Sequence, residues 1–296
     1  MPNLNYASSY QSELSQAYPY VLNYGALYAT PNNGRYRWVN SKTIEIPSIS
    51  TSGRVNADRD TIAAAKRNYD NSWEPKTLSN QRKWSTLVHP QDIDQTNMVA
   101  SIGNITRVFN EEQKFPEMDA YLISKLYTDW TALSNTADET VLTTDNVLSV
   151  FDDLMKKMTE ARVPSAGRIL YVTPDVNTLI KNAKNIQRNF DVQSGSTSLK
   201  MAITSIDNVE IVEVPKELIM TAYDFTVGWK PGSSAKQINM FLVHPAAVIT
   251  PVSYQFSKLD PPSAGSEGKY IYYEESFEDA FILNKRAASL QFNITA

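Results

Sequence analysis

The chain has 296 residues, of which 42% are hydrophobic and 20% charged, and it carries a net charge of −4. This length accommodates one large domain or two smaller ones, and no run approaches the roughly 18 apolar residues of a membrane span. The absence of cysteine excludes disulfides and thiolate metal sites and fits a reducing cytoplasm, while the first residues lack the pattern of a secretory signal.

Residues 1–34 have the composition of a polar arm. They contain six tyrosines among Asn, Ser and Gln, and a single charge, that of Glu13. Such a segment is too polar to fold alone, but tyrosines are common at interfaces. We therefore expect an arm that becomes ordered on a neighbouring subunit through Tyr18, Tyr20 and Tyr24, with a mobile tail as the alternative.

Residues 35–92 have the pattern of an extended hairpin loop. Ile44 and Ile46 alternate with polar residues until Pro47 interrupts the strand, and residues 50–53 supply turn chemistry. Proline is tolerated only at sheet edges and bulges, which indicates a two-stranded ribbon outside any larger sheet. Because an isolated ribbon is marginally stable in water, this hairpin needs a partner surface.

The hairpin region is the basic part of an acidic chain, since residues 35–95 carry a net charge of +3. Three interpretations remain open: binding to nucleic acid, solubility of an exposed ribbon, and alignment on a more acidic neighbouring subunit. The candidate contact residues of this region are Gly53, Arg54, Arg59, Lys66 and Arg67.

Residues 93–137 predict two helices joined end to end. Asp94 is the expected cap of the first helix, and Pro116 suits the first turn of the second. Together they would form a rod of roughly 40 residues, about 60 Å long if straight, which fits a flat tiling plate better than a compact monomer. Apolar residues at helical spacing carry this prediction: Met98, Ile102, Ile105 and Phe109, then Met118, Leu122, Leu126, Trp130 and Leu133.

Residues 138–247 predict a layered α/β segment. One helix presents the apolar face Val147, Val150, Phe151, Leu154 and Met158, with Thr144 as its expected cap, and a second begins at 173–175 and runs to about residue 185. Strands are expected at 169–172, 209–214 and 239–243.

Residues 248–296 return to strands. The segment 248–258 alternates imperfectly, a turn-rich loop follows at 260–268, and 270–283 predicts one long bent strand with 288–292 as its partner.

The serial order of these elements resembles the major capsid proteins of tailed bacteriophages, which have the Hong Kong 97-type fold. The segments that carry the resemblance span roughly residues 20–293: the hairpin strands around 42–47 and 73–78, the step at 92–94, the helix junction from Arg107 to Ala120, the central α/β segment, and the closing strand at 273–283. The resemblance implies an α+β fold with five parts: an N-terminal arm (1–34), an extended hairpin loop (35–92), spine helices (93–137), an axial α/β domain (138–247) and return strands of the peripheral domain (248–296).

The same resemblance implies a structural protein that self-assembles, through hexameric and pentameric capsomers, into the icosahedral shell around the double-stranded DNA of a tailed phage. The implied partners are further copies of the chain, a portal protein, packaged DNA contacted non-specifically, and a separate scaffolding protein, because the long helical N-terminal extension of some relatives is missing. The implied location is the virion, after assembly in the host bacterial cytoplasm, with no membrane contact. The alternatives are an encapsulin-like compartment, against which the polar arm argues, and a β-rich enzyme or binding module.

Catalytic patterns are missing from the sequence. Its two histidines, His89 and His244, each precede a proline and lack a third ligand at metal spacing, so caps and turns explain them better. No nucleophile elbow, phosphate-binding glycine loop or dinucleotide fingerprint occurs. We therefore expect no enzymatic activity, metal or cofactor; a divalent ion held between subunits by the acidic run 274–279 is the alternative.

Overall fold

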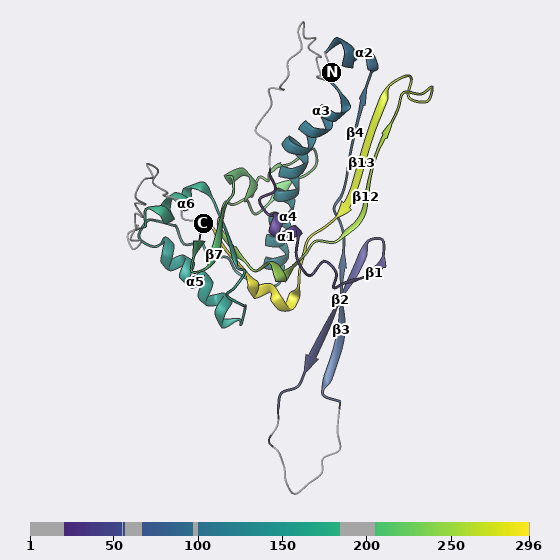
Figure 1. The fold of residues 1–296 in the computed structure, drawn as a ribbon. Coiled ribbons are helices and arrows are strands. Elements are labelled where there is room, and N and C mark those ends of the chain that lie inside the picture. Colours follow the sequence, from purple (N-terminus) through teal and green to yellow (C-terminus); the bar gives the residue numbers. More distant parts are fainter. Residues whose placement is uncertain (1–20, 55, 57–66, 97–99, 184–204, 296) are drawn as a thin grey trace, which may run out of the picture.

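The computed structural model describes residues 21–54, 56, 67–96, 100–183 and 205–295. Figure 1 shows three regions: an α/β body, a long helical rod with an extended sheet beside it, and a β-hairpin that projects beyond both.

The elements follow one another in an order that mixes helices and strands throughout. The helices are α1 (Gly25–Tyr28), α2 (Pro90–Gln95), α3 (Ile102–Phe109), the π-helical turn η1 (Asn110–Lys114), α4 (Phe115–Ala132), α5 (Val147–Glu160) and α6 (Pro174–Lys181), with short 3-10 turns η2 (Lys216–Leu218), η3 (Pro245–Ala247) and η4 (Asn284–Ser289). The strands are β1 (Arg37–Asn40), β2 (Thr43–Thr51), β3 (Tyr69–Thr77), β4 (Gln81–Val88), β5 (Ile169–Val172), β6 (Ser205–Ile206), β7 (Val209–Glu213), β8 (Tyr223–Asp224), β9 (Lys230–Pro231), β10 (Ile238–Val243), β11 (Val248–Ile249), β12 (Val252–Asp260), β13 (Tyr270–Glu278), β14 (Phe281–Ile282) and β15 (Leu290–Ile294).

The body is a five-stranded sheet in the order β15-β10-β5-β7-β6, in which only β5 and β7 run parallel. All four residues of β5 are buried, as a strand covered on both faces requires. Side chains alternate between the faces, so Leu170 and Val172 pack on α5 and α6 while Tyr171 packs toward α4. The predicted strands and the predicted face of α5 are confirmed, whereas the cap of α5 is Asn146 and not Thr144.

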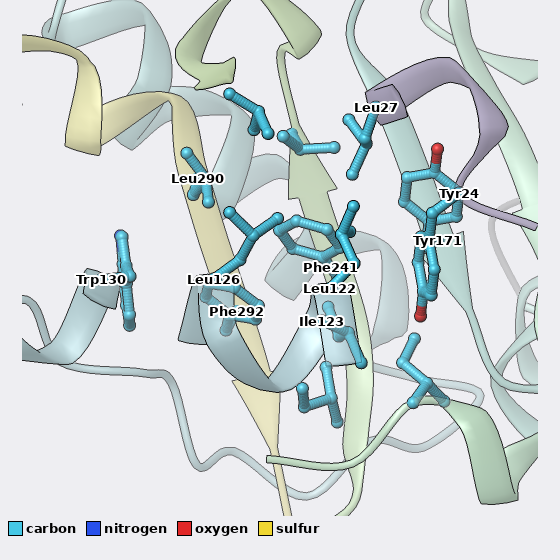
Figure 2. Packing of buried hydrophobic residues seen from close by; sticks show 14 of the residues in the cluster. Tyr24, Leu27, Leu122, Ile123, Leu126, Trp130, Tyr171, Phe241, Leu290 and Phe292 are labelled. Carbon is cyan, nitrogen blue, oxygen red and sulfur yellow. The ribbon is translucent and has the colours of Figure 1, made fainter. Parts of the chain in front are cut away.

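A row of aromatic rings ties the rod to the sheet. Trp130 of α4 lies 4.9 Å from Phe292, which stacks on Phe241 at 4.5 Å; Phe241 then faces Tyr171 at 5.7 Å. Figure 2 shows these rings side by side with leucines of α4 and β15, and Tyr24 at the far end of the row. Aromatic pairs at such distances add to the stability gained from burial, so this row is the centre of the core.

The helical rod runs without interruption from α3 through η1 into α4. Pro116 has no N–H and its ring crowds the carbonyl four residues earlier, which would break a regular helix. The π-helical turn resolves the conflict, because the Phe115 N–H bonds to the oxygen of Asn110, five residues back. The prediction of two joined helices is confirmed for this part of the chain.

The start of the rod differs from the prediction. Asp94 lies inside the short helix α2, whose cap is His89, and α3 begins later with Ser101 as its cap. Met98 lies outside the described residues. The rod is therefore shorter than the sequence pattern predicted.

An antiparallel sheet in the order β12-β13-β4 lies along the rod (Figure 1). Trp84 of β4 stacks on Phe109 of α3 with ring centres 3.9 Å apart. Because β4 belongs to this sheet, the region predicted as one hairpin loop divides into a true hairpin and a strand of the extended sheet. The predicted partner of the long strand is also wrong, since β15 pairs with β10 in the body, while β13 pairs with β12 and β4.

Residues 21–34 pack against the body of their own chain. The buried carboxylate of Asp119 on α4 accepts hydrogen bonds from the backbone N–H groups of Asn23, at 2.8 Å, and Tyr24, at 3.4 Å. Along the described part of the chain, no helix combines the length and apolar character needed to cross a membrane.

Candidate assembly surfaces

The β2–β3 hairpin is a long element that is exposed over much of its length. Its strands pair without a break from Thr43 opposite Thr77 to Thr51 opposite Tyr69, and it projects away from the body in Figure 1. Ile44 and Ile46 are buried at its base, but beyond Pro47 the side chains of both strands are largely uncovered.

Apolar side chains remain in this uncovered half. Ile49 is 67% exposed, Tyr69 58% and Trp73 42%. Scattered exposed apolar residues are ordinary on a surface, but three on one projecting ribbon form a surface that water solvates poorly. None of the apolar clusters formed by the described residues includes them.

Polar contacts attach the hairpin to the body, and one of them reaches the backbone of Ile49, beyond Pro47. Lys285 Nζ donates to the Ile49 carbonyl at 2.9 Å, and Lys76 Nζ donates to Asn284 Oδ1 at 2.8 Å. Within the hairpin's own sheet, Arg37 of the neighbouring strand β1 forms an ion pair with Glu45 at 2.8 Å, and its guanidinium lies 4.3 Å from the centre of the Trp73 ring. The hairpin is therefore a supported projection whose outer half is available to another molecule.

The extended sheet presents a second exposed surface. Trp84 faces the rod, so the alternation of side chains directs Phe256 and Tyr273 to the opposite face, where their ring centres lie 6.2 Å apart. Tyr254 and Phe256 stack with ring centres 6.3 Å apart and are 46% and 39% exposed. This aromatic face has no covering element among the described residues.

A cavity of about 550 Å³ lies between the rod and the extended sheet. Two ion pairs cross it: Arg82 with Glu117 at 2.6 Å, and Lys114 with Glu274 at 3.1 Å. Burial raises the pKa of Glu278, Lys114 opposes that rise, and the carboxylates of Glu117 and Asp279 add to it. The two ion pairs join the sheet to the rod, which is a structural role for these charged side chains.

The predicted contact residues lie in three different situations. Tyr24 is fully buried in its own subunit, where its ring lies 4.7 Å from that of Tyr171 and its hydroxyl donates to Leu218, so it does not face a neighbour as expected. Gly53 and Arg54 are exposed beyond the end of β2. Open space surrounds the Cα of Gly53, so a side chain would be accommodated there.

Arg67 is also exposed, and its guanidinium lies 4.9 Å from the ring of Tyr69 just before β3. Tyr18, Tyr20, Arg59 and Lys66 lie outside the described residues. Sequence reasoning missed Ile49 and Tyr69 as contact candidates. Each is an apolar residue on one strand of the hairpin: Ile49 comes just before the predicted turn at 50–53, and Tyr69 begins the returning strand.

The two histidines have the capping roles that the sequence predicted. His89 Nδ1 accepts from the Gln91 N–H at 3.1 Å, and His244 Nδ1 accepts from the Ala246 N–H at 3.2 Å. The Asp279 carboxylate is likewise occupied, by donors from Ser79, Tyr121 and Ala280. Within the described residues, no group of three or more His, Asp or Glu side chains is placed to hold a metal ion.

Comparisons with known proteins give a consistent result at the level of structure. No family model matches the chain, and no curated protein matches it. The structure of Mycobacterium phage Che8 is similar with a TM-score of 0.62 at 14% identity, over 97% of this chain and 96% of that one.

Two further solved structures cover nearly the whole chain. The mature capsid of bacteriophage PhiM1 matches with a TM-score of 0.65 at 11% identity, over 100% of this chain and 90% of that one. The capsid of an empty GTA particle matches with a TM-score of 0.61 at 9% identity, over 98% and 95%. The rod, the extended sheet, the α/β body and the projecting hairpin therefore together form the α+β fold of bacteriophage capsid subunits, the Hong Kong 97-type fold.

Proposed function

We propose that this chain is the repeating subunit of an icosahedral shell that encloses the double-stranded DNA of a tailed bacteriophage. The observation that carries the proposal is the near-complete mutual coverage between this chain and capsid structures: little is left over on either side for a different activity. The role is structural, and the chain acts by contacts between copies.

The exposed hairpin supports this role physically. Burial of apolar surface contributes about 25 cal/mol per Å², so covering Ile49, Tyr69 and Trp73 on a neighbour is worth a few kcal/mol per contact. A contact of that size is reversible for one pair of subunits. Repeated around a closed shell, where each subunit has several neighbours, it becomes strong.

The proposal also covers the assembly partners of the chain. The copies associate as hexameric and pentameric capsomers, a separate scaffolding protein and a portal protein take part, and the packaged DNA is contacted without sequence preference. Assembly takes place in the bacterial host cytoplasm, and the product resides in the virion. The basic charge of residues 35–95 supports contacts either with DNA or with more acidic parts of neighbouring copies.

Sedimentation and negative-stain microscopy of the purified chain test the proposal. We expect closed particles or capsomer rings that form above a threshold protein concentration. A chain that stays monomeric over a hundredfold range of concentration, with or without a crowding agent, would contradict a shell function.

A pair of matched variants locates the contact on the hairpin. Ile49→Asp should prevent shell closure without lowering the free energy of unfolding, because the side chain contacts solvent in the isolated subunit. Val141→Asp is the control, since Val141 is 72% exposed on the body. Normal shells from Ile49→Asp would remove the hairpin from the interface.

A further inference from the structure

A cavity of about 470 Å³ on the body concentrates positive charge. It lies between the segment after α5, the turns η3 and η4, and the segment after α1. Four cationic side chains line it, those of Arg35, Arg162, Lys285 and Arg286, and its lining contains no Asp or Glu. In a chain of net charge −4, four cations around one cavity without a carboxylate form an unbalanced site.

Two of these cations are held in position by the backbone. Arg286 donates to the Ala246 carbonyl at 2.6 Å, and Lys285 donates to the Ile49 carbonyl at 2.9 Å. Neutral carbonyls orient a cation without neutralising it. Among the described residues, none of the four cations takes part in an ion pair with a carboxylate.

A fifth positive charge lies in the protein wall beside the cavity. Arg168 is 1% exposed, and its guanidinium donates to neutral acceptors alone, including the carbonyls of Pro164 and Val163 at 2.9 and 2.7 Å. A buried cation without a carboxylate partner leaves a positive field in its surroundings. Glu74 lines the adjoining cavity at the base of the hairpin, and no other Asp or Glu is among the lining residues of the two cavities.

His244 lies beside the same positive charges. Burial lowers the pKa of His244, and the positive charges of Arg168 and Arg286 lower it further, against a hydrogen bond with the backbone of Ala166. The ring is therefore neutral near pH 7. It lines the cavity, so an anion bound there would raise its pKa.

We propose that the cavity formed by Arg35, Arg162, Lys285 and Arg286 binds a phosphate group, either as the free ion or as a phosphodiester of nucleic acid. Charge matching favours phosphate over a carboxylate of a neighbouring copy, because free phosphate carries about two negative charges at neutral pH and a nucleic-acid strand brings several phosphodiester charges in a row, whereas a carboxylate neutralises one of the four cations. Guanidinium groups bind phosphate oxygens through paired hydrogen bonds, and three arginines line this cavity. The inference stands on the cavity alone and does not depend on shell formation.

Equilibrium dialysis of the full chain against radiolabelled inorganic phosphate tests the proposal. We expect saturable binding of about one phosphate per chain, weakened on the order of tenfold or more in Arg162→Gln/Lys285→Gln. The control Arg67→Gln/Lys83→Gln removes the same charge from exposed positions elsewhere and should bind as the wild type does. Thermal melts establish that both double variants fold.

A histidine titration by NMR provides a second measurement, and the chain offers an internal reference because it has only two histidines. Phosphate should raise the pKa of His244 by about 0.5 to 1 unit and leave His89 unchanged. The shift should disappear in Arg162→Gln/Lys285→Gln.

Competition identifies the source of the phosphate. A 20-base-pair duplex that displaces labelled phosphate at constant ionic strength assigns the site to nucleic acid, and a duplex that does not displace it assigns the site to the free ion. Acetate binding as tightly as phosphate would overturn the proposal in favour of a carboxylate from another copy. Binding that does not saturate, or that falls equally in the control variant, would also overturn it.

Discussion

The α/β body and the β2–β3 hairpin are both built on paired strands but differ in what covers their side chains. The body buries both faces of its sheet, with α4 on one side and α5 and α6 on the other. The hairpin strands pair continuously, yet beyond Pro47 most of their described side chains are exposed. Strand pairing alone therefore does not show which region is stable without a partner. The burial of the side chains does distinguish the body from the hairpin.

Two tryptophan substitutions should show the largest difference between these regions. Trp130 is 1% exposed, contacts Phe292 and donates to the Ala287 carbonyl at 3.2 Å. Trp130→Ala should lower the free energy of unfolding of the unassembled subunit by about 3–5 kcal/mol, measured by denaturant titration. Trp73→Ala in the hairpin is the matched control and should lower it by less than about 1 kcal/mol. Similar losses in both variants would show that the hairpin is as integral to the subunit as the body.

Removing a buried carboxylate should have the next largest effect. Asp119→Ala removes the buried carboxylate that accepts hydrogen bonds from the N–H groups of Asn23 and Tyr24, which should destabilise the subunit by about 2 kcal/mol. The amides of these two residues should exchange with deuterium roughly tenfold faster or more. Asp129→Ala is the control, because it loses only an ion pair with Lys125 within the same helix, worth about 0.5 kcal/mol. Unchanged exchange in Asp119→Ala would show that packing of Tyr24 alone retains this segment.

The pH dependence of stability should reveal Glu278 at the junction of rod and sheet. Because burial raises its pKa in the folded subunit, the folded state binds a proton more tightly than the unfolded state does. Its contribution to stability is present below the ordinary glutamate pKa of about 4.3 and is lost as the pH rises through the raised value. Glu278→Gln should therefore flatten the fall in melting temperature above that pH.

Glu275 on the same strand is the control for this effect, with the opposite sign. A hydrogen bond from Tyr273 lowers the pKa of Glu275, and a second from Gln81 adds to it, so Glu275→Gln should not relieve any loss of stability at higher pH. The same melting profile in both variants would exclude Glu278 as the source.

The smallest effect per subunit should come from exposed charges of the hairpin. Arg54 and Arg67 are exposed, and pairs of such charges with carboxylates of a neighbour are worth about 0–1 kcal/mol each and weaken with salt. The protein concentration needed for assembly, measured by light scattering, should rise with salt, and Arg54→Glu with Arg67→Glu should imitate high salt. Assembly that improves steadily with salt would indicate that apolar burial alone drives the contact.

Much of the body could be predicted from the sequence because its signals are local. The apolar face of α5, the strands β5, β7 and β10, and the start of α6 all follow from patterns within a few residues, although α6 ends at Lys181 and not near residue 185. The partners of strands did not follow. Residues 288–292 were predicted as a strand, but only the tertiary structure decides that β15 lies beside β10 and that residues 81–88 form a strand beside β13.

The candidate surfaces, too, could be predicted only where the signal is local in the sequence. The prediction of a two-stranded ribbon from Pro47 is wrong at the base of the hairpin, because β1 pairs with β2 there and the sheet has the order β1-β2-β3. The burial of Tyr24 could not be foreseen, since its backbone partner Asp119 lies 95 residues away in the sequence. Charge at the hairpin tip is visible in the sequence, whereas the exposure of Ile49 and Trp73 depends on what the rest of the chain leaves uncovered.

The position of β15 has a consequence for biosynthesis. This strand follows all others in the chain, yet it pairs with β10 and supplies Phe292 to the aromatic row. At about 5–20 residues per second, a ribosome needs roughly 15–60 s to reach it, and the body cannot close before then. The hairpin, encoded in the first third of the chain, emerges long before its own subunit is complete. Nascent chains on one messenger RNA therefore expose the apolar residues of the hairpin before their α/β bodies have folded. In that period these residues are a binding site for a chaperone.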